Sequence, residues 1–273
     1  MHPVILRLGP IVISSYGLFL ALSFILGLWL ASVRARRMGL DRRLVVAAAF
    51  WIVLAAMAGA RLCYVVQHYR DFVGRPLSII LPTGGGSGGL NGLTMYGGVI
   101  GGILAAFIFF AVKKVPFLPY ADAIAPSVGL GIFLTRIGCF LNGCCFGLPT
   151  STWLGVHFPL NSPAGKYELA VNAPKLLPSE LFLSGSGLVV LAGVLLIKPS
   201  KASAGTSFYV MGILCSSLSF ALDFTRFYPL SERLGPLTHT QVTTLILFLI
   251  FLGLLLRKAF RKGRTGTIEE RAG

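Results

Sequence analysis

The chain has 273 residues, of which 55% are hydrophobic and 12% charged, and its formal net charge is +15. Its mean hydropathy of +0.80 lies above the usual range for a soluble domain. So large a positive charge would indicate a nucleic-acid partner in a soluble protein. In a chain this apolar we expect no nucleic acid, and we predict an all-α, polytopic integral membrane protein.

Apolar stretches of about twenty residues, long enough to cross about 30 Å of hydrocarbon, recur along the whole chain. They predict seven spanning helices, at residues 11–33, 44–66, 93–112, 120–141, 179–197, 206–222 and 242–256. The first stretch is too long for the apolar part of a cleaved signal peptide, and it ends in arginines rather than at a small-residue cleavage site. We therefore predict that it is retained as a helix.

The basic residues are distributed unevenly between the two sides of these spans. Fifteen of the 24 lysines and arginines follow the first, third, fifth or seventh span. They are Arg34, Arg36, Arg37, Arg42, Arg43, Lys113, Lys114, Lys198, Lys201, Arg257, Lys258, Arg261, Lys262, Arg264 and Arg271. Because basic loops stay in the cytoplasm, the pattern predicts an outer N-terminus and a cytoplasmic C-terminus. Residues 1–273 then form a single membrane domain with outward loops at about 68–92 and 145–178.

The two outward loops differ in composition. The first contains a glycine-rich run at residues 84–89, which predicts a mobile outer loop, and it leads to Gly98, Gly101 and Gly102, which share one helical face and predict close helix packing. The second is lightly charged and rich in aromatic residues such as Trp153. We expect it to lie on the outer headgroup layer rather than to form a separate soluble domain.

Three arginines stand apart from the basic loops. Arg61, Arg136 and Arg226 are each flanked by apolar sequence near the outer end of a span. An arginine at the centre of a spanning helix costs roughly 2.5–3.5 kcal/mol on insertion scales, so the three need a common explanation. A pocket for an anionic lipid phosphate is the simplest, because a guanidinium presents a planar fork to phosphate oxygens. The alternative is snorkelling with an internal pair, such as Arg226 with Asp223.

The cysteines and histidines favour no cofactor. Five cysteines are too few for a disulfide scaffold, their spacing matches no zinc pattern, and the four histidines are scattered singly. The glycine-rich segments lack the lysine of a phosphate-binding loop. We therefore predict neither metal nor nucleotide. Four cysteines lie toward the outer face, where apolar packing is the expected role and a redox or disulfide role is the alternative: Cys63, Cys139, Cys144 and Cys145.

The densest polar signal is residues 136–147, at the outward end of the fourth span. This segment combines Arg136, Asn142, three cysteines and three glycines. In hydrocarbon the amide of Asn142 would need partners for two donors and an acceptor, so we expect it to face a polar cavity or to cap the helix. Gly143 and Gly147 would let the backbone leave the helix there.

With these residues the sequence resembles the prolipoprotein diacylglyceryl transferases, bacterial integral membrane enzymes that begin lipoprotein maturation. The resemblance covers most of the chain and depends on the order of several short motifs rather than on any one of them. The motifs are residues 15–18 (SYGL), 59–64 (GARLCY), 92–98 (GLTMYGG), 122–126 (DAIAP), 136–147 (RIGCFLNGCCFG), 178–182 (PSELF) and 223–226 (DFTR).

The resemblance implies transfer of the diacylglyceryl group from phosphatidylglycerol to the lipobox cysteine in the signal-peptide segment of a preprolipoprotein. A thioether would form and glycerol phosphate would leave. It also implies a multi-pass protein of the bacterial inner membrane, among membrane lipids, with no cofactor. Residue by residue, it assigns catalysis to Tyr96, Arg136 and Arg226, and substrate binding to Tyr16, Arg61, Asn142, Gly143 and Cys144. Asp223 occupies a further charged position of the family pattern.

The sequence departs from the family pattern mainly in its site residues. Tyr96 stands where the family usually has histidine, Cys139 for asparagine, Cys144 for glutamate and Ser219 for arginine. Since the thiol must lose a proton to attack, Tyr96 is the candidate for proton handling. The departures leave open a divergent enzyme, a relative with another substrate, or a non-catalytic lipid-binding protein. A lipid or small-molecule transporter is a further alternative, although the sequence contains no evident internal repeat.

Overall fold

The computed structural model describes residues 4–8, 11–73, 94–198, 204–228 and 233–272. The glycine-rich run at 84–89 lies outside them. The helices are α1 (Ser15–Arg37), α2 (Arg42–Gln67), α3 (Tyr69–Phe72), α5 (Met95–Val112), α6 (Phe117–Asn142), α7 (Pro163–Ala170), α8 (Ser179–Leu195), α9 (Thr206–Asp223) and α10 (His239–Ala272). The short strands β1 (Val4–Leu8) and β2 (Ile11–Ser14) form one antiparallel pair, and β3 (Arg233–Leu234) and β4 (Leu237–Thr238) another.

Most of these helices are apolar. Within the described residues, five are long and apolar enough to cross a membrane: Ser15–Arg37, Arg42–Gln67, Phe117–Asn142, Thr206–Asp223 and His239–Phe260. Gly97–Val112 and Ser179–Leu195 are shorter apolar helices. These seven helices coincide with the seven stretches predicted from sequence. Large side chains such as Phe24 and Trp29 are exposed on them, as expected where lipid is the solvent.

The first predicted span is wrong at its beginning. Residues 11–14 form β2, which pairs with β1, and the helix starts at Ser15. Ile11, Val12 and Ile13 are β-branched residues that favour strands. Ser14 is the N-cap, and its Oγ accepts a hydrogen bond from the Gly17 amide at 3.1 Å. Hydropathy alone could not separate an apolar strand from the helix that follows it.

The described chain divides into two compact units, one of Met1–Met38 with Ala121–Gly273 and one of Gly39–Tyr120. In the second unit α2 packs against α5 through small residues. A Cβ built on Gly59 would lie 2.5 Å from the Gly97 carbonyl oxygen, so the two backbones are nearly in contact. Gly98, Gly101 and Gly102 all face α2 as predicted, and Gly101 makes the closest approach of the three.

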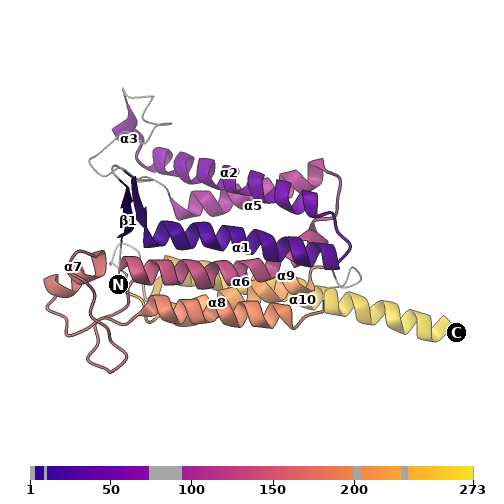
Figure 1. Cartoon of the computed structure of the whole chain (residues 1–273). Coiled ribbons are helices and arrows are strands. Elements are labelled where there is room, and N and C mark those ends of the chain that lie inside the picture. The colour runs from indigo at the N-terminus through magenta and orange to yellow at the C-terminus, as the bar shows by residue number, and fades with distance from the viewer. Residues whose placement is uncertain (1–3, 9–10, 74–93, 199–203, 229–232, 273) are drawn as a thin grey trace. The chain divides into compact units, whose positions relative to one another are not determined.

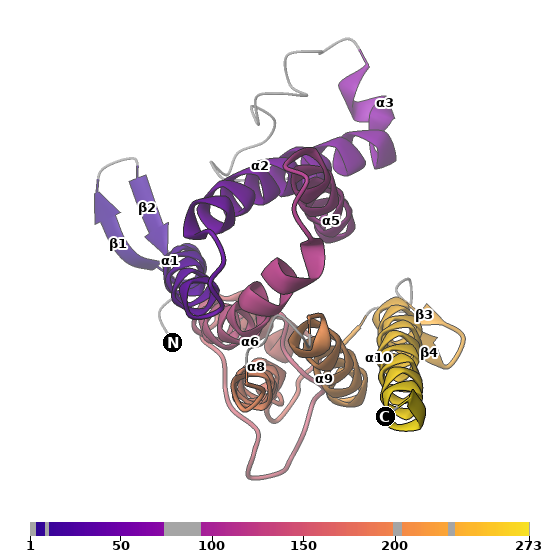
Figure 2. The same cartoon turned by 90° about the vertical axis from the view of Figure 1, so that its right-hand side faces the viewer.

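In the first unit α6 is the central helix. The end-on view places α6 between α1, α8 and α9, with α10 against α9 (Figure 2). The contacts agree, since the Ser127 hydroxyl of α6 donates to the Gly27 carbonyl of α1 at 2.7 Å, and Ser184 of α8 donates to the Phe133 carbonyl of α6 at 3.0 Å. Figure 1 shows these helices running alongside one another.

Two charged side chains join the helices at one end of this unit. Arg34 Nη2 of α1 donates to Ser207 Oγ at 2.9 Å and to the carbonyls of Ile197 and Val194 at 3.3 and 3.4 Å, at the C-terminal end of α8. A cation there satisfies carbonyls that have no partner in their own helix. Arg34 was counted from sequence among the basic residues of the cytoplasmic segments, and it is buried, with 5% of its surface exposed.

Asp122 has the complementary role at the start of α9. Its carboxylate accepts hydrogen bonds from the Gly205 amide at 2.6 Å and the Phe208 amide at 2.8 Å. The amides of a helix N-terminus carry partial positive charge, so an anion is favourable there. This explains the acidic residue of the 122–126 motif as a structural one.

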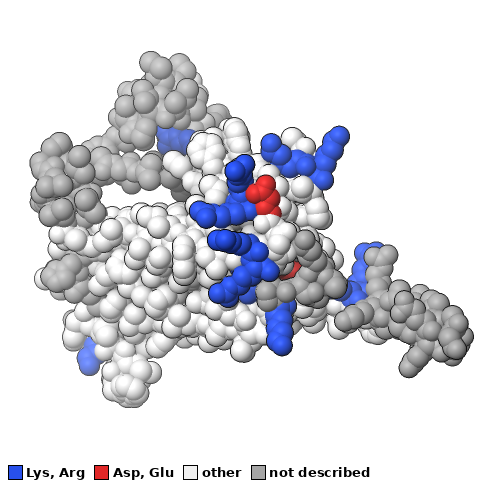
Figure 3. Space-filling view, turned by 45° about the vertical axis from the view of Figure 1, so that its right-hand side comes forward, with Lys and Arg blue, Asp and Glu red and all other residues white. Residues whose placement is uncertain are grey.

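Several basic residues lie at helix ends, and Figure 3 shows the described lysines and arginines that reach one face of the surface. In the first unit Arg36 and Arg37 lie in the last turn of α1. Arg34 of the same turn binds the Ile197 carbonyl, and Lys198 is the next residue. In the second unit Arg42 and Arg43 begin α2, and Lys113 follows the end of α5. In each unit the charges therefore gather at the end that was predicted to be cytoplasmic.

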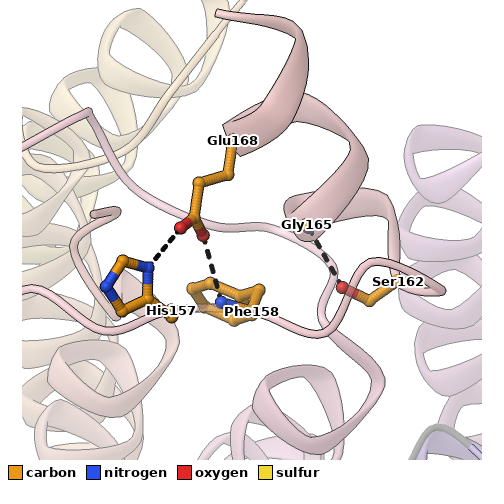
Figure 4. Close-up of polar contacts among 5 residues, drawn as sticks. All are labelled: His157, Phe158, Ser162, Gly165 and Glu168. Atoms are coloured by element: carbon orange, nitrogen blue, oxygen red, sulfur yellow. Dashed lines mark hydrogen bonds and ion pairs between the residues drawn. The ribbon is translucent and has the colours of Figure 1, made fainter. Parts of the chain in front are cut away.

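The loop that follows α6, which was predicted from sequence to face outward, folds compactly around α7. Ser162 Oγ caps this helix by accepting from the Gly165 amide at 3.1 Å, and Pro163 occupies its first turn. Glu168 binds back to the loop, with one oxygen 2.5 Å from His157 Nδ1 and the other 3.0 Å from the Phe158 amide (Figure 4). Phe158, with Ala164 and Leu176, forms a small buried core.

The contact between α6 and α8 gives the most direct test of the fold. A Cβ on Gly187 would lie 2.5 Å from the Phe133 amide nitrogen and 2.8 Å from the Gly129 carbonyl oxygen. Gly187→Ala should therefore lower the free energy of unfolding by about 1–3 kcal/mol, because the helices must separate. The measurement is the unfolding temperature of the purified protein in detergent.

Gly185→Ala is the matched control on the same helix, since nothing lies within 4 Å of a Cβ at Gly185. It should be neutral, or slightly stabilising through the helix propensity of alanine. Equal unfolding temperatures for the two variants would contradict the close packing of α6 on α8.

Candidate functional site

The site begins where α6 ends. Asn142 is the last residue of α6, and Gly143 follows in the left-handed region with a φ of +69°, a conformation that glycine adopts without strain. A Cβ on Gly143 would lie 2.5 Å from Ser162 Cβ, and the Gly143 carbonyl accepts from the Ala164 amide at 2.9 Å. The prediction that Gly143 lets the backbone leave the helix is confirmed, and the outward loop packs directly on this turn.

The turn meets the beginning of α8 and the end of α9. Gly147 pairs with Arg226 in an isolated antiparallel bridge, and the Leu148 amide donates to the Thr225 carbonyl at 3.0 Å. Ser179, in the first turn of α8, donates from its hydroxyl to the same carbonyl at 2.8 Å. These contacts hold residues 147, 179 and 226 together. The space around Gly147 is too small for a residue with a larger side chain.

Arg226 is held by a hydrogen-bonded chain rather than by an ion pair. Its Nη1 donates to the Tyr228 hydroxyl at 3.1 Å, and that hydroxyl donates to Asp223 Oδ1 at 2.5 Å. Thr238 donates to the other oxygen of Asp223, also at 2.5 Å. Burial and the bond to Asp223 raise the pKa of Tyr228 to about 12, so the phenol keeps its proton at neutral pH. Among the described residues Asp223 and Arg226 form no ion pair, contrary to the internal pair considered from sequence.

Arg136 and Glu180 are charged groups for which the described part of the chain supplies no hydrogen-bond partner. Within the described residues the Arg136 guanidinium makes no hydrogen bond or ion pair. Glu180, in the first turn of α8, has 0% of its surface exposed, and neither carboxylate oxygen has a hydrogen-bond partner in the described part of the chain. The Nε of Arg226 is likewise buried without a partner. The charges of Arg136 and Arg226 both act on the Glu180 carboxylate, so the three groups belong to one site.

Three thiols belong to the same site. The Sγ atoms of Cys139, Cys144 and Cys145 all lie within 4.8 Å of one another. Hydrogen bonds from Cys139 and Cys144, with the charges of Arg226 and Arg136, lower the pKa of the Cys145 thiol. All five cysteines of the chain are free thiols.

The structure brings together six of the residues predicted from sequence. Arg136, Asn142, Gly143, Cys144 and Arg226 lie around the turn after α6. Tyr16 begins α1 beside them, because a Cβ on Gly138 would lie 3.3 Å from the Tyr16 Cα. Asn142 is half-buried with its side chain at the Cys144 thiol, consistent with a polar lining role.

Arg61 and Tyr96 lie in the other unit. Arg61, on α2, has its guanidinium 5.4 Å from the centre of the Phe72 ring. Tyr96 is in the first turn of α5, and its side chain is not among the described ones. Their assignment to the site stays a prediction.

Sequence analysis missed Glu180 and Tyr228. Glu180 lies in the 178–182 motif, at the start of an apolar span. An ionisable residue in a spanning segment indicates a functional site, so this position could have been identified from sequence. Tyr228 gave no signal, because its importance comes from a hydrogen bond to Asp223 across the turn that ends α9.

Taken together, in the described part of the chain the site offers two guanidinium groups that form no ion pair and a buried carboxylate that accepts no hydrogen bond. Arginines of this kind bind phosphate oxygens, and a buried carboxylate can accept a proton. The arrangement therefore suits cleavage of a bond to phosphate by a nucleophile that must lose a proton.

Comparisons with known proteins agree with this chemistry. The family model described as prolipoprotein diacylglyceryl transferase matches residues 3–257. A protein of Trichormus variabilis is 35% identical over 158 residues, which are 58% of this chain and 54% of that protein. A protein of Acaryochloris marina is 34% identical over 255 residues, which cover 89% of this chain and 86% of that protein. A protein of Thermosynechococcus vestitus is 32% identical over 242 residues, which cover 88% of this chain and 87% of that protein. All three are named phosphatidylglycerol–prolipoprotein diacylglyceryl transferase.

The fold and the site define an integral membrane protein whose apolar helices hold a cluster of charged groups at one end. Within that class the match over residues 3–257 is specific: the chain belongs to the prolipoprotein diacylglyceryl transferase family. The resemblance seen in the short motifs is thereby confirmed. The chain spans about half the length of the first curated relative described above, and most of the length of the other two.

Proposed function

We propose that this protein transfers the diacylglyceryl group of phosphatidylglycerol to the lipobox cysteine of preprolipoproteins. The cysteine sulfur forms a bond to the carbon of the diacylated glycerol that is attached to the phosphate. The bond between this carbon and the phosphate oxygen breaks, and glycerol phosphate leaves. The observation that carries the proposal is the pair Arg136 and Arg226, two guanidinium groups whose charges act on one buried carboxylate, with the Nε of Arg226 buried and unpartnered within the described residues.

In this proposal the two arginines bind the phosphate and stabilise the charge that develops on it as the bond breaks. Donors already in place where charge develops are the largest single contribution in many enzymes. Arg226 is positioned by Tyr228, which is fixed by Asp223. Asp223 is in turn bound by Thr238, the N-cap of α10, whose amide donates to Gln241 Oε1 at 2.9 Å.

Glu180 is the proton acceptor in this proposal. The lipobox thiol must lose its proton before or during attack, and Glu180 offers two unpartnered oxygens in a buried position. The proton of the thiol passes to this carboxylate and later leaves with the glycerol phosphate or to water. A tyrosine at position 96 is a weaker base, because an unperturbed phenol has a pKa near 10.

Arg136→Ala and Arg226→Ala should each lower the transfer rate roughly 100-fold or more, the usual effect of removing a donor to developing charge. Lysine at either position should rescue poorly, because it cannot reproduce the two-pronged contact with phosphate. The assay is incubation of the purified protein with phosphatidylglycerol and a lipobox peptide, followed by mass spectrometry for the added diacylglyceryl mass.

Arg36→Ala is the matched control, since Arg36 is an exposed arginine at the far end of α1, and it should keep the wild-type rate. Wild-type rates in both site variants would contradict the phosphate assignment. Absence of transfer by the wild-type protein, with phosphatidylglycerol still bound, would favour the non-catalytic lipid-binding alternative.

Glu180→Gln should lower the transfer rate by roughly 10²–10⁴-fold, the contribution typical of general base catalysis, while phosphatidylglycerol binding is retained. In the wild type the rate should fall at acid pH as the carboxylate takes up a proton, and this dependence should be lost from the residual activity of the variant. Glu168→Gln, which changes a carboxylate of the outward loop, is the control. If Tyr96→Phe loses activity and Glu180→Gln does not, the proton acceptor is Tyr96.

We further propose that all seven apolar helices cross the bacterial inner membrane, with the N-terminus outside and the C-terminus in the cytoplasm. The basic residues at the ends of α1, α2 and α5 support this orientation, because basic segments stay in the cytoplasm. It places Arg136, Arg226 and Glu180 at the outer face and the two shorter helices α5 and α8 across the bilayer.

This topology predicts opposite accessibility for two engineered cysteines. Ser151→Cys, on the exposed outward loop, should react in intact cells with an impermeant maleimide, and Lys113→Cys should react only after the membrane is permeabilised. Both are compared with the wild type, whose own thiols give the background, and a reporter fused after Gly273 should be cytoplasmic. Labelling of Lys113→Cys but not Ser151→Cys in intact cells would overturn the orientation.

A further inference from the structure

The proposed transfer gives no chemical step to the three thiols at the end of α6, although the family resemblance places Cys144 among the substrate-binding residues. The lipobox peptide supplies the nucleophilic sulfur, the arginines bind the phosphate, and Glu180 takes the proton. Yet the Sγ atoms of Cys139, Cys144 and Cys145 converge within 4.8 Å of one another. The two remaining cysteines of the chain, Cys63 and Cys215, lie on α2 and α9 and do not belong to this group.

The backbone is shaped to bring these thiols together. Cys139 lies in the last turn of α6, and the chain then reverses through Gly143 with a φ of +69° and Cys145 with a φ of +65°. The left-handed region is unfavourable for a residue with a side chain, and Cys145 adopts it. The Cys144 thiol is directed back to the Cys139 carbonyl at 3.7 Å. Simple apolar packing does not require such a turn.

We infer that Cys139, Cys144 and Cys145 form a binding site for a soft, thiol-preferring metal ion of the monovalent copper class, coordinated by three sulfur atoms. The inference does not depend on the proposed transferase activity.

The geometry suits three-coordinate binding. Metal–sulfur bonds of about 2.3 Å would place three sulfurs about 4 Å apart around a central ion, and the thiols already lie within 4.8 Å of one another. Among the described residues the group contains no fourth cysteine, histidine or carboxylate. A structural zinc site is normally closed by four ligands, whereas monovalent copper is selected by soft thiolates.

The surrounding charges also suit thiolate ligands. Binding releases the thiol protons, so three thiolates around a monovalent cation carry two net negative charges. Arg136 and Arg226 both act on the Cys145 sulfur as well as on the Glu180 carboxylate, and their positive charges stabilise the thiolate form of the ligands.

The test is competition for monovalent copper between the purified protein and the chelator bicinchoninate, under anaerobic, reducing conditions. The wild type should remove one equivalent of copper from the coloured complex. Cys139→Ser, Cys144→Ser and Cys145→Ser should each weaken binding at least tenfold. Cys63→Ser and Cys215→Ser are the matched controls and should bind as the wild type does. The unfolding temperature of each variant shows that it is folded.

Three results would overturn the inference. The wild type could fail to compete with the chelator, binding could persist in a variant with serine at all three positions, or zinc could be bound in preference to copper by the same three cysteines. Transfer of the diacylglyceryl group is measured separately, so a failure of the proposed activity leaves this result interpretable.

Discussion

The structure depends on one constraint: a charge buried among apolar helices must have a partner. At one end of the α6-centred unit this requirement is largely met within the protein, because Arg34 Nη2 binds the carbonyls that end α8 and Asp122 binds the amides that begin α9, although Arg34 Nε has no partner in the described residues. At the opposite end it is not met. Glu180 and the Nε of Arg226 are buried without hydrogen-bond partners in the described residues, and the half-buried Arg136 makes no hydrogen bond there. An unsatisfied buried charge costs several kcal/mol, so a ligand is the natural explanation.

The close packing of the helices holds these charged groups in fixed positions. Gly129, Gly138 and Gly187 let α6 approach α8 and α1 closely, and the backbone of the outward loop closes over the turn at Gly143. The rigid framework then holds Arg226 through Tyr228 and Asp223. Since each charged group is held by a different helix, the site exists only when the whole unit is folded. Of the substituted positions, Cys139 lies in the last turn of α6 and Cys144 in the turn that follows it.

Much of the fold was predictable because it depends on local sequence patterns. Runs of apolar residues marked each long helix, and the glycines at 98, 101 and 102 correctly indicated close packing of α5 on α2. The limits were also local: residues 11–14 form a strand although they are as apolar as the helix that follows. Hydropathy measures the preference for lipid, not the backbone conformation.

The site was predicted less completely, for a different reason. Arg136, Asn142, Gly143 and Arg226 were identified because charged, amide and glycine residues are conspicuous in apolar sequence. The roles of Glu180 and Tyr228 depend on contacts between segments far apart in the chain or across a turn, which no periodicity reveals. The convergence of three thiols depends on two residues with positive φ, and it could not be read from the spacing of the cysteines.

The central claim is that Arg136 and Arg226 bind the phosphate of the lipid donor. The most direct test is an experimental structure of the protein with phosphatidylglycerol bound. The account predicts phosphate oxygens about 2.7–3.2 Å from both guanidinium groups, with the adjacent glycerol carbon facing the Glu180 carboxylate. A phosphate bound elsewhere, with Arg136 and Arg226 paired to protein groups instead, would contradict it.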